Sequence, residues 1–233
     1  MSAPIVIALP FTSLWLVQNS PARRVPSHGT DLWGERYAID FIGVDARRRT
    51  AAQRDWRTVF ATEPAERFFA FGRAILSPVD GIVVEVHDGE IDHVARRSQL
   101  ALVPYALGQS ARVRRGVEAI AGNFLTVKLD GREAFVVLVH LRAGSIRVSP
   151  GEKVTTGQPI GECGNSGNST QPHLHLQVMD SPDLSRASGL PMQFRRYRES
   201  ARGTTHFQIR ESGVPAEGAV VEPLHVGVAE SGR

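Results

Sequence analysis

Short apolar runs bounded by turn residues recur along most of the chain. Runs of this length that are rich in β-branched residues are typical of β-strands, and the N-terminal apolar stretch predicts one or two further strands. Asp130-Gly131 lies between two such runs and predicts a hairpin. The clearest predicted strands are Ile82–Val86, Phe124–Leu129, Ala134–Leu141, His173–Val178 and Met192–Arg198.

Two long stretches without this pattern interrupt the predicted strands, at about residues 45–71 and 87–116. Insertions of this length at the edge of a β-fold often shape a binding cleft. We therefore expect an all-β sandwich or flattened barrel with long inserted loops, in one domain over residues 1–200. Residues 201–233 are expected to form a C-terminal extension, loosely packed from Pro215 onward.

The bulk composition narrows the class of protein. The chain has 233 residues, a formal net charge of +3 and a mean hydropathy of -0.15, which fits a globular protein. Its arginine clusters are dispersed and accompany no nucleic-acid-binding motif, so we predict no nucleic-acid partner. The N-terminus lacks a clear signal peptide, and no segment is long and apolar enough for a membrane span. The single cysteine, Cys163, is expected to be a packing residue.

Two histidines, His173 and His175, are spaced i, i+2 on a predicted strand, after a turn rich in Gly, Asn and Ser. Side chains with this spacing lie on one face of a strand, so both imidazoles can reach one point. Such a pair suits a metal site or an acid/base pair. Two polar positions on a solvated sheet face would give the same pattern.

Three further polar residues stand in apolar surroundings. His140 lies near the end of a strongly apolar run, and His28 lies in a segment rich in turn residues. Asp40 lies between Ile39 and Phe41, where a carboxylate requires a cationic partner. A zinc hydrolase site uses three N or O ligands and one open position for water, which two histidines and one aspartate satisfy. The other histidines are expected to be surface or loop residues: His87, His93, His206 and His225.

These segments, in this order, resemble the lysostaphin/LytM-type zinc metalloendopeptidases, which cut peptidoglycan cross-bridges and stem peptides. The resemblance spans residues 27–180 and rests on the segments around His28, YAIDF, PVDGIVVEV, VLVHL and PGEKVTTGQPIGECGNSGNSTQPHLHLQV. It implies a lysostaphin-like β-fold of the duplicated-hybrid-motif type and one zinc ion per chain. The metal ligands it implies are His28, Asp40 and His175, with His140 and His173 as catalytic residues.

The chain departs from the family pattern at the first two ligands. The family usually spaces them as HxxxD, whereas twelve positions separate His28 from Asp40. Asp31 is closer to His28 but lies in a predicted turn. We therefore predict Asp40 as the ligand, with Asp31, Trp33 and Glu35 on an extra loop at the cleft rim.

The resemblance predicts a zinc-dependent endopeptidase that hydrolyses peptide bonds in peptidoglycan, acting outside the cytoplasm. Two alternatives are weighed against it. A catalytically inactive domain that binds the cell wall or regulates other hydrolases would share the fold; no functional position is lost here, but the unusual ligand spacing keeps this alternative open. A phosphocarrier domain of the glucose-permease IIA kind would also use paired histidines, but it explains neither Asp40 nor the HxH spacing. The sequence determines neither the oligomeric state nor which peptide bond is cut.

Overall fold

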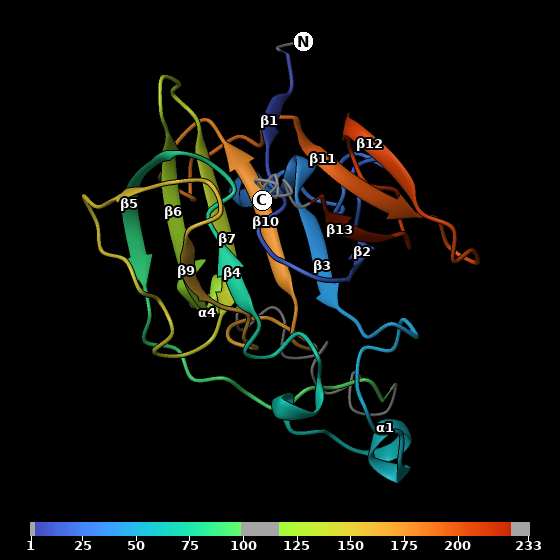
Figure 1. The fold of residues 1–233 in the computed structure, drawn as a ribbon. Coiled ribbons are helices and arrows are strands. Elements are labelled where there is room, and N and C mark those ends of the chain that lie inside the picture. Colours follow the sequence, from blue (N-terminus) through green and yellow to red (C-terminus); the bar gives the residue numbers. More distant parts are fainter. Residues whose placement is uncertain (1–2, 99–116, 225–233) are drawn as a thin grey trace, which may run out of the picture.

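The computed structural model describes residues 3–98 and 117–224, which are mostly β-structure (Figure 1). Within these residues no helix has the length and apolar character needed to cross a membrane. The strands are β1 (Ile5–Ile7), β2 (Trp15–Gln18), β3 (Ile39–Gly43), β4 (Ala74–Leu76), β5 (Gly81–His87), β6 (Asn123–Leu129), β7 (Phe135–Leu141), β8 (Lys153–Val154), β9 (Pro159–Glu162), β10 (Leu174–Met179), β11 (Met192–Ser200), β12 (Gln208–Gly213) and β13 (Val220–Pro223). The helical segments are α1 (Trp56–Phe60), α4 (Val117–Ala121) and the 3-10 turns η1 (Leu32–Tyr37) and η2 (Ala65–Arg67).

One large sheet forms the body of the molecule. Its strand order is β1-β11-β13-β2-β3-β10-β7-β6-β5-β8, with β12 paired to β11, and it does not close into a barrel. β4 and β9 form a separate two-stranded sheet. The all-β class and the positions of the predicted strands are confirmed, and β6 and β7 form the hairpin predicted around Asp130-Gly131.

Alternation along the central strands separates the main core from a second face. On β10, Leu174, Leu176 and Val178 pack into the main hydrophobic cluster with residues of β3 and β7. The intervening residues His175 and Gln177 lie on the opposite face, because successive side chains of a strand point to opposite sides. All six residues of β10 are nonetheless buried, so polar groups on this second face require partners.

The C-terminal segment contradicts the predicted loose packing. β13 pairs antiparallel with both β11 and β2, and Ala219, Val220 and Val221 are at most 1% exposed. The short run has no alternating pattern to mark it, because both of its faces are covered. The prediction of loose packing from Pro215 is therefore wrong through Leu224, and residues 225–233 lie outside the described part. The domain boundary at residue 200 stays a prediction.

The two predicted insertions contact each other. Glu63, in the first insertion, exchanges backbone hydrogen bonds with Ala95 in the second, at 2.9 and 2.8 Å. Its buried carboxylate accepts two hydrogen bonds from Arg97, at 2.7 and 2.6 Å. The second insertion is described only as far as Ser98, and its remainder up to residue 116 lies outside the described residues.

Candidate active site

His28, Asp40 and His175 converge on one point, with one ligand atom of each within 4.8 Å of the others. Asp40 on β3 lies directly opposite His175 on β10 in the antiparallel pairing. Its two carboxylate oxygens lie 3.1 Å from Nε2 of His28 and 2.9 Å from Nδ1 of His175. The two strands therefore fix two members of the group, and a loop brings the third.

That loop explains how His28 reaches Asp40 despite the twelve-residue spacing. The backbone N–H of Ser27 donates to the carbonyl of Arg36 at 3.1 Å, and the hydroxyl of Ser27 contacts the carbonyl of Glu35 at 3.2 Å. These bonds close the loop at its base. His28 consequently lies next to Arg36, which precedes Asp40 by four residues.

Asp31 lies away from this group. Its side chain is exposed and accepts a hydrogen bond from Arg36 at 2.7 Å. Trp33 and Glu35 come from the same loop and line a pocket beside His175, as the sequence predicted for a cleft rim. The geometry thus places Asp40, and not Asp31, between the two histidines.

Hydrogen bonds around His28 and His175 orient one ring nitrogen of each toward Asp40. The amide N–H of Gln177 donates to the carbonyl of Trp33 at 2.6 Å, which orients the amide oxygen of Gln177 toward Nε2 of His175 at 3.0 Å. Nε2 of His175 therefore donates, which leaves its Nδ1, the atom that faces Asp40, to hold either a proton or a metal ion. Likewise, the Ser27 hydroxyl donates to Glu35 and accepts from Nδ1 of His28, which frees Nε2.

Two imidazole nitrogens and a carboxylate that face one point require a proton or a metal ion between them. This donor set of two N ligands and one O ligand is the kind that binds catalytic zinc. Burial would raise the pKa of Asp40, but hydrogen bonds with His175 and His28 hold it well below its usual value. Burial would lower the pKa of His175, but Asp40 raises it to about 9, so a proton competes with a metal ion for this site. His28, Asp40 and His175 therefore fit the zinc ion that the sequence predicted.

His140 reaches the same face of the sheet through a β-bulge. The pairing of β6 with β7 skips His140, since Asn123 pairs with Leu141 and Phe124 with Val139. His140 has a φ of 63°, in the left-handed region, which is uncommon for residues other than glycine. Regular alternation would turn its side chain toward the main core, whereas the bulge turns it toward His173, with ring centroids 4.7 Å apart.

Within residues 3–98 and 117–224, neither Nε2 of His140 nor Nε2 of His173 makes a hydrogen bond. Nδ1 of His140 donates to the carbonyl of Ser166 at 3.0 Å, and Nδ1 of His173 donates to the carbonyl of Gln171 at 2.8 Å. Nε2 of His173 lies 3.9 Å from the nearer oxygen of Asp40. Burial lowers the pKa of both imidazoles, that of His140 well below its usual value, so both are neutral at pH 7 and can accept a proton.

The turn before the HxH pair holds these histidines in place, a role that sequence analysis missed. The hydroxyl of Ser166 donates to the carbonyl of Leu141 at 2.8 Å and accepts from the backbone of Asn123 at 3.0 Å. Asp92 and His93 of the second insertion bind the same turn, at the backbone of Asn165 and the carbonyl of Gly167. In the sequence these positions read only as turn formers, because their partners are distant along the chain.

The remaining histidines of the described part lie outside this group. The ring of His87 stacks on Phe124 with a centroid distance of 5.7 Å, and His206 is exposed. His93 supports the turn as described above. His225 lies outside the described residues.

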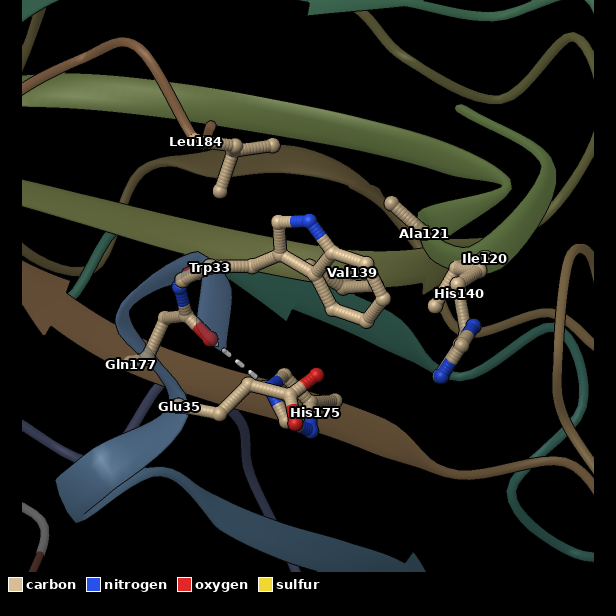
Figure 2. Close-up of a pocket in the computed structure, with 9 residues that line it drawn as sticks. All are labelled: Trp33, Glu35, Ile120, Ala121, Val139, His140, His175, Gln177 and Leu184. Atoms are coloured by element: carbon tan, nitrogen blue, oxygen red, sulfur yellow. Dashed lines mark hydrogen bonds between the residues drawn. The ribbon is translucent and has the colours of Figure 1, made fainter. Parts of the chain in front are cut away.

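A pocket opens beside His140 and His175 (Figure 2). Trp33 forms one wall, and its backbone lies in the left-handed region with φ 55° and ψ 22°. A bulky residue held in this region costs about 1–3 kcal/mol, which the surrounding contacts must offset. Gly34 follows with φ 77°, and a Cβ there would lie 2.8 Å from Sδ of Met179. The two residues together bend η1 over β10.

The family comparison identifies the class of protein. The model of peptidase family M23 matches residues 67–186, more than half of the chain. The chain belongs to peptidase family M23. The matched residues include His140, His173 and His175, whereas His28 and Asp40 precede them. The lysostaphin/LytM-type resemblance of the sequence is thereby confirmed.

Among individual relatives, one matches over only part of the chain, and the solved structures match at low sequence identity. The chain is 33% identical over 90 residues to the peptidoglycan DD-endopeptidase ShyA of Vibrio cholerae. The aligned region covers 38% of this chain and 20% of ShyA, so the match spans about a fifth of that relative's length. Its structure is similar to the catalytic domain of lysostaphin from Staphylococcus simulans, with 17% identity, 76% and 88% coverage and a TM-score of 0.39. The EnpA catalytic domain from Enterococcus faecalis matches with 17% identity, 82% and 91% coverage and a TM-score of 0.38.

Proposed function

We propose that this M23 protein is a zinc-dependent endopeptidase that hydrolyses peptide bonds in bacterial peptidoglycan, outside the cytoplasm. The observation that carries the proposal is the convergence of ligand atoms from His28, Asp40 and His175 beside two further histidines, His140 and His173, whose Nδ1 atoms are anchored on backbone carbonyls. The ShyA relative, named as a peptidoglycan DD-endopeptidase, supports the substrate class.

In this proposal His28 Nε2, a carboxylate oxygen of Asp40 and Nδ1 of His175 hold one zinc ion. Zinc bound there would supply Lewis acidity and lower the pKa of a water molecule toward neutrality. Asn19 donates to Asp40 at 2.7 Å and Gln177 accepts from His175, so both ligands are held in orientation from behind.

The two other histidines handle the proton and the developing charge. One Nε2, of His140 or of His173, accepts the proton of the water that attacks the peptide carbonyl. The other imidazole can stabilise the oxyanion once its Nε2 carries a proton and donates it in a hydrogen bond to the charged oxygen. Their Nδ1–H groups are anchored on backbone carbonyls, so both rings are already oriented before substrate binds.

Zinc stoichiometry in three forms of the protein tests the metal site. Elemental analysis of the wild type is expected to give one zinc per chain, retained in Asp31→Ala and lost in Asp40→Ala. Asp31→Ala is the matched control, because it removes a carboxylate from the same loop without touching the group. Zinc loss only in Asp31→Ala would overturn the ligand assignment. A wild type that binds no zinc, even after reconstitution, would leave the binding or regulatory module as the function.

Hydrolysis of purified peptidoglycan, followed by separation of the released peptides, tests the activity itself. New amino termini are expected with the zinc-loaded wild type and not after chelation. A zinc-loaded protein that releases no peptide ends would contradict the endopeptidase proposal while leaving the metal site intact.

A further inference from the structure

The short helix α1 in the first insertion displays three large apolar side chains to solvent. Trp56, Val59 and Phe60 are 63%, 56% and 64% exposed, and no residue of α1 is buried. Their i, i+3, i+4 spacing places them on one side of the helix. Figure 1 shows α1 at one end of the molecule, away from the large sheet. These side chains therefore belong to none of the buried clusters.

Polar contacts fasten α1 to the rest of the protein at both ends. Asp55 caps the first turn, where it accepts from the backbone N–H of Arg57 at 3.0 Å and from the side chain of Arg67 at 2.8 Å. At the other end, the carbonyl of Val59 accepts a hydrogen bond from the hydroxyl of Ser98. A helix anchored in this way holds its apolar side outside the core, so the exposure of that side is a property of the fold.

A basic hollow lies beside the apolar side of α1, and Val59 belongs to both. The volume of the hollow is about 760 Å³, within the range that accommodates a small organic group. Among the described residues that line it, none is acidic and four are arginines: Arg48, Arg49, Arg54 and Arg97.

Two of these arginines have no carboxylate partner in the described part of the chain. Arg48 donates to a hydroxyl and two carbonyls, which are neutral acceptors, and Arg54 is exposed and forms no ion pair. Arg49 and Arg97, in contrast, each pair with a carboxylate. The hollow thus carries positive charge that an anion can neutralise, and guanidinium groups match the geometry of a phosphate.

An anionic phospholipid membrane presents both complements of this surface at once. Its phosphate groups lie directly above acyl chains, so basic and apolar side chains that stand next to each other can both be satisfied there. Tryptophan is enriched at this boundary of membrane proteins because its ring is amphipathic. A soluble anion would fill only the hollow and would leave Trp56, Val59 and Phe60 in water.

The apolar side of α1 is too small for a stable protein interface. A buried aromatic side chain contributes about 150–250 Å², so the exposed parts of Trp56, Val59 and Phe60 together offer less than about 500 Å². A specific protein–protein interface takes about 800 Å² from each partner. A bilayer, in contrast, accepts single side chains.

We propose that α1 and the basic hollow dock this protein on membranes rich in anionic phospholipid. The apolar side of α1 enters the acyl region, and lipid phosphate groups face Arg48 and Arg54. The second insertion, which contacts α1 through Ser98, also holds the turn of the candidate site through Asp92 and His93. Docking therefore keeps the candidate site close to the membrane surface.

Sedimentation with lipid vesicles tests the docking. The protein is expected to bind vesicles of phosphatidylcholine and phosphatidylglycerol in equal parts, less at high salt, and to stay in solution with phosphatidylcholine alone. Phe60→Ser is expected to weaken binding about tenfold through lost apolar burial. Arg54→Gln is expected to weaken it about fivefold, the effect of removing one arginine from an anionic surface.

Two exposed residues away from α1 provide matched controls. Ile209 on β12 is 65% exposed, nearly the same fraction as Phe60, and the side chain of Arg186 is 84% exposed. Ile209→Ser and Arg186→Gln are expected to bind vesicles like the wild type. Equal losses in Phe60→Ser and Ile209→Ser, or no binding of the wild type to anionic vesicles, would overturn the proposal.

The fluorescence of Trp56 tests insertion. The chain has three tryptophans; Trp15 is fully buried, and Trp33→Phe removes the third from the signal. In this variant, anionic vesicles are expected to shift the emission to shorter wavelength, and brominated acyl chains are expected to quench it. Binding without quenching would mean that charge alone attracts the protein, which would overturn the insertion of α1.

The remaining outcomes assign the surface to another occupant. Inorganic phosphate that displaces the protein from vesicles at micromolar concentration would overturn the membrane in favour of a soluble anion. Self-association in sedimentation velocity that Phe60→Ser abolishes, without vesicle binding, would assign the apolar side of α1 to a second copy of the chain. None of these variants touches the candidate metal ligands, so a failed docking test leaves the proposed peptidase intact.

Discussion

At the scale of single residues, the histidines of the site fall into two pairs. The pairs differ in which group each ring nitrogen faces. His28 and His175 direct a ring nitrogen at the carboxylate of Asp40, whereas His140 and His173 anchor Nδ1 on backbone carbonyls. In the proposed mechanism, this division separates the residues that would hold a metal ion from the residues that would move a proton.

The division predicts different losses on substitution. His140→Ala and His173→Ala are each expected to keep one zinc per chain but to lose about 10²–10⁴-fold in kcat/KM, the usual contribution of an acid/base residue. Elemental analysis together with peptidoglycan hydrolysis gives both readouts on the same preparation. Loss of zinc in His140→Ala would show that this residue is a ligand.

Gln177 is predicted to position His175. Gln177→Leu removes the acceptor at Nε2 of His175, so zinc affinity is expected to fall about 10–100-fold in chelator competition. Gln177→Glu keeps an acceptor oxygen but cannot donate to the Trp33 carbonyl, so it separates the two contacts. If the glutamate variant loses as much affinity as the leucine variant, the contact with Trp33 is the one that matters.

Sequence analysis found the five candidate residues but could not show how they meet. His140 is on a run whose alternation directs it toward the core, and only the bulge at φ 63° turns it to the other face. The twelve-residue spacing to Asp40 is bridged by the bond between Ser27 and Arg36. Both features depend on backbone geometry between distant or irregular residues, which leaves no periodic signal.

At the scale of elements, the turn η1 is shaped by its two left-handed residues. Gly34→Ala is expected to destabilise the protein by about 3 kcal/mol, because it adds both backbone strain and a contact with Met179 at 2.8 Å. Gly131→Ala is the control with a similar φ of 71° and no neighbour within 4 Å, and about 1 kcal/mol is expected there. Denaturant unfolding measures both, and equal losses would mean that the close packing of η1 on β10 contributes nothing.

The contact between the two insertions depends on Glu63. Its carboxylate is buried, and hydrogen bonds from Arg97 lower its pKa against the opposing effect of burial. Because the folded pKa lies below the unfolded value, the stabilisation is present above about pH 4.5 and is lost as the pH falls through the folded pKa. Glu63→Gln is expected to cost about 2 kcal/mol at pH 7, since Arg97 loses its counter-ion.

The pH dependence of the free energy of unfolding provides a control for the Glu63→Gln prediction. The difference in unfolding free energy between wild type and Glu63→Gln should shrink as the pH is lowered below about 4.5. Glu133→Gln breaks an exposed pair with Lys128 and should cost less than about 1 kcal/mol. A Glu63→Gln difference that stays constant down to pH 3 would contradict the charge explanation.

Sequence analysis identified the strands that show two features together, a regular strand pattern and turn residues at the ends. β5, β6, β7 and β10 combine β-branched residues with turn residues at their ends. β12 is polar and exposed along most of its length and pairs with β11 alone, so its sequence, QIRESG, carries no apolar face to detect. β13 is too short for alternation and is buried by neighbours on both sides.

At the scale of the whole molecule, the sheet depends on β13. A chain ending at Val214 lacks this strand and exposes the facing edges of β2 and β11, so it is expected to lose cooperative unfolding in thermal denaturation. A chain ending at Leu224 keeps every described residue and serves as the control. Cooperative unfolding of the shorter chain near the control's midpoint would show that β13 is dispensable.

The position of β13 also sets an order of events during synthesis. β2 flanks β3, the strand of Asp40, and in the described residues its other edge pairs with residues 218–221, which follow Asp40 by about 180 residues. While the chain emerges from the ribosome, β2 therefore keeps a free edge, open to pairing with a neighbouring chain. The carboxylate at the centre of the site thus gains its full support only after nearly all of the described chain has been made, so partial chains are expected to aggregate before they can assemble the site.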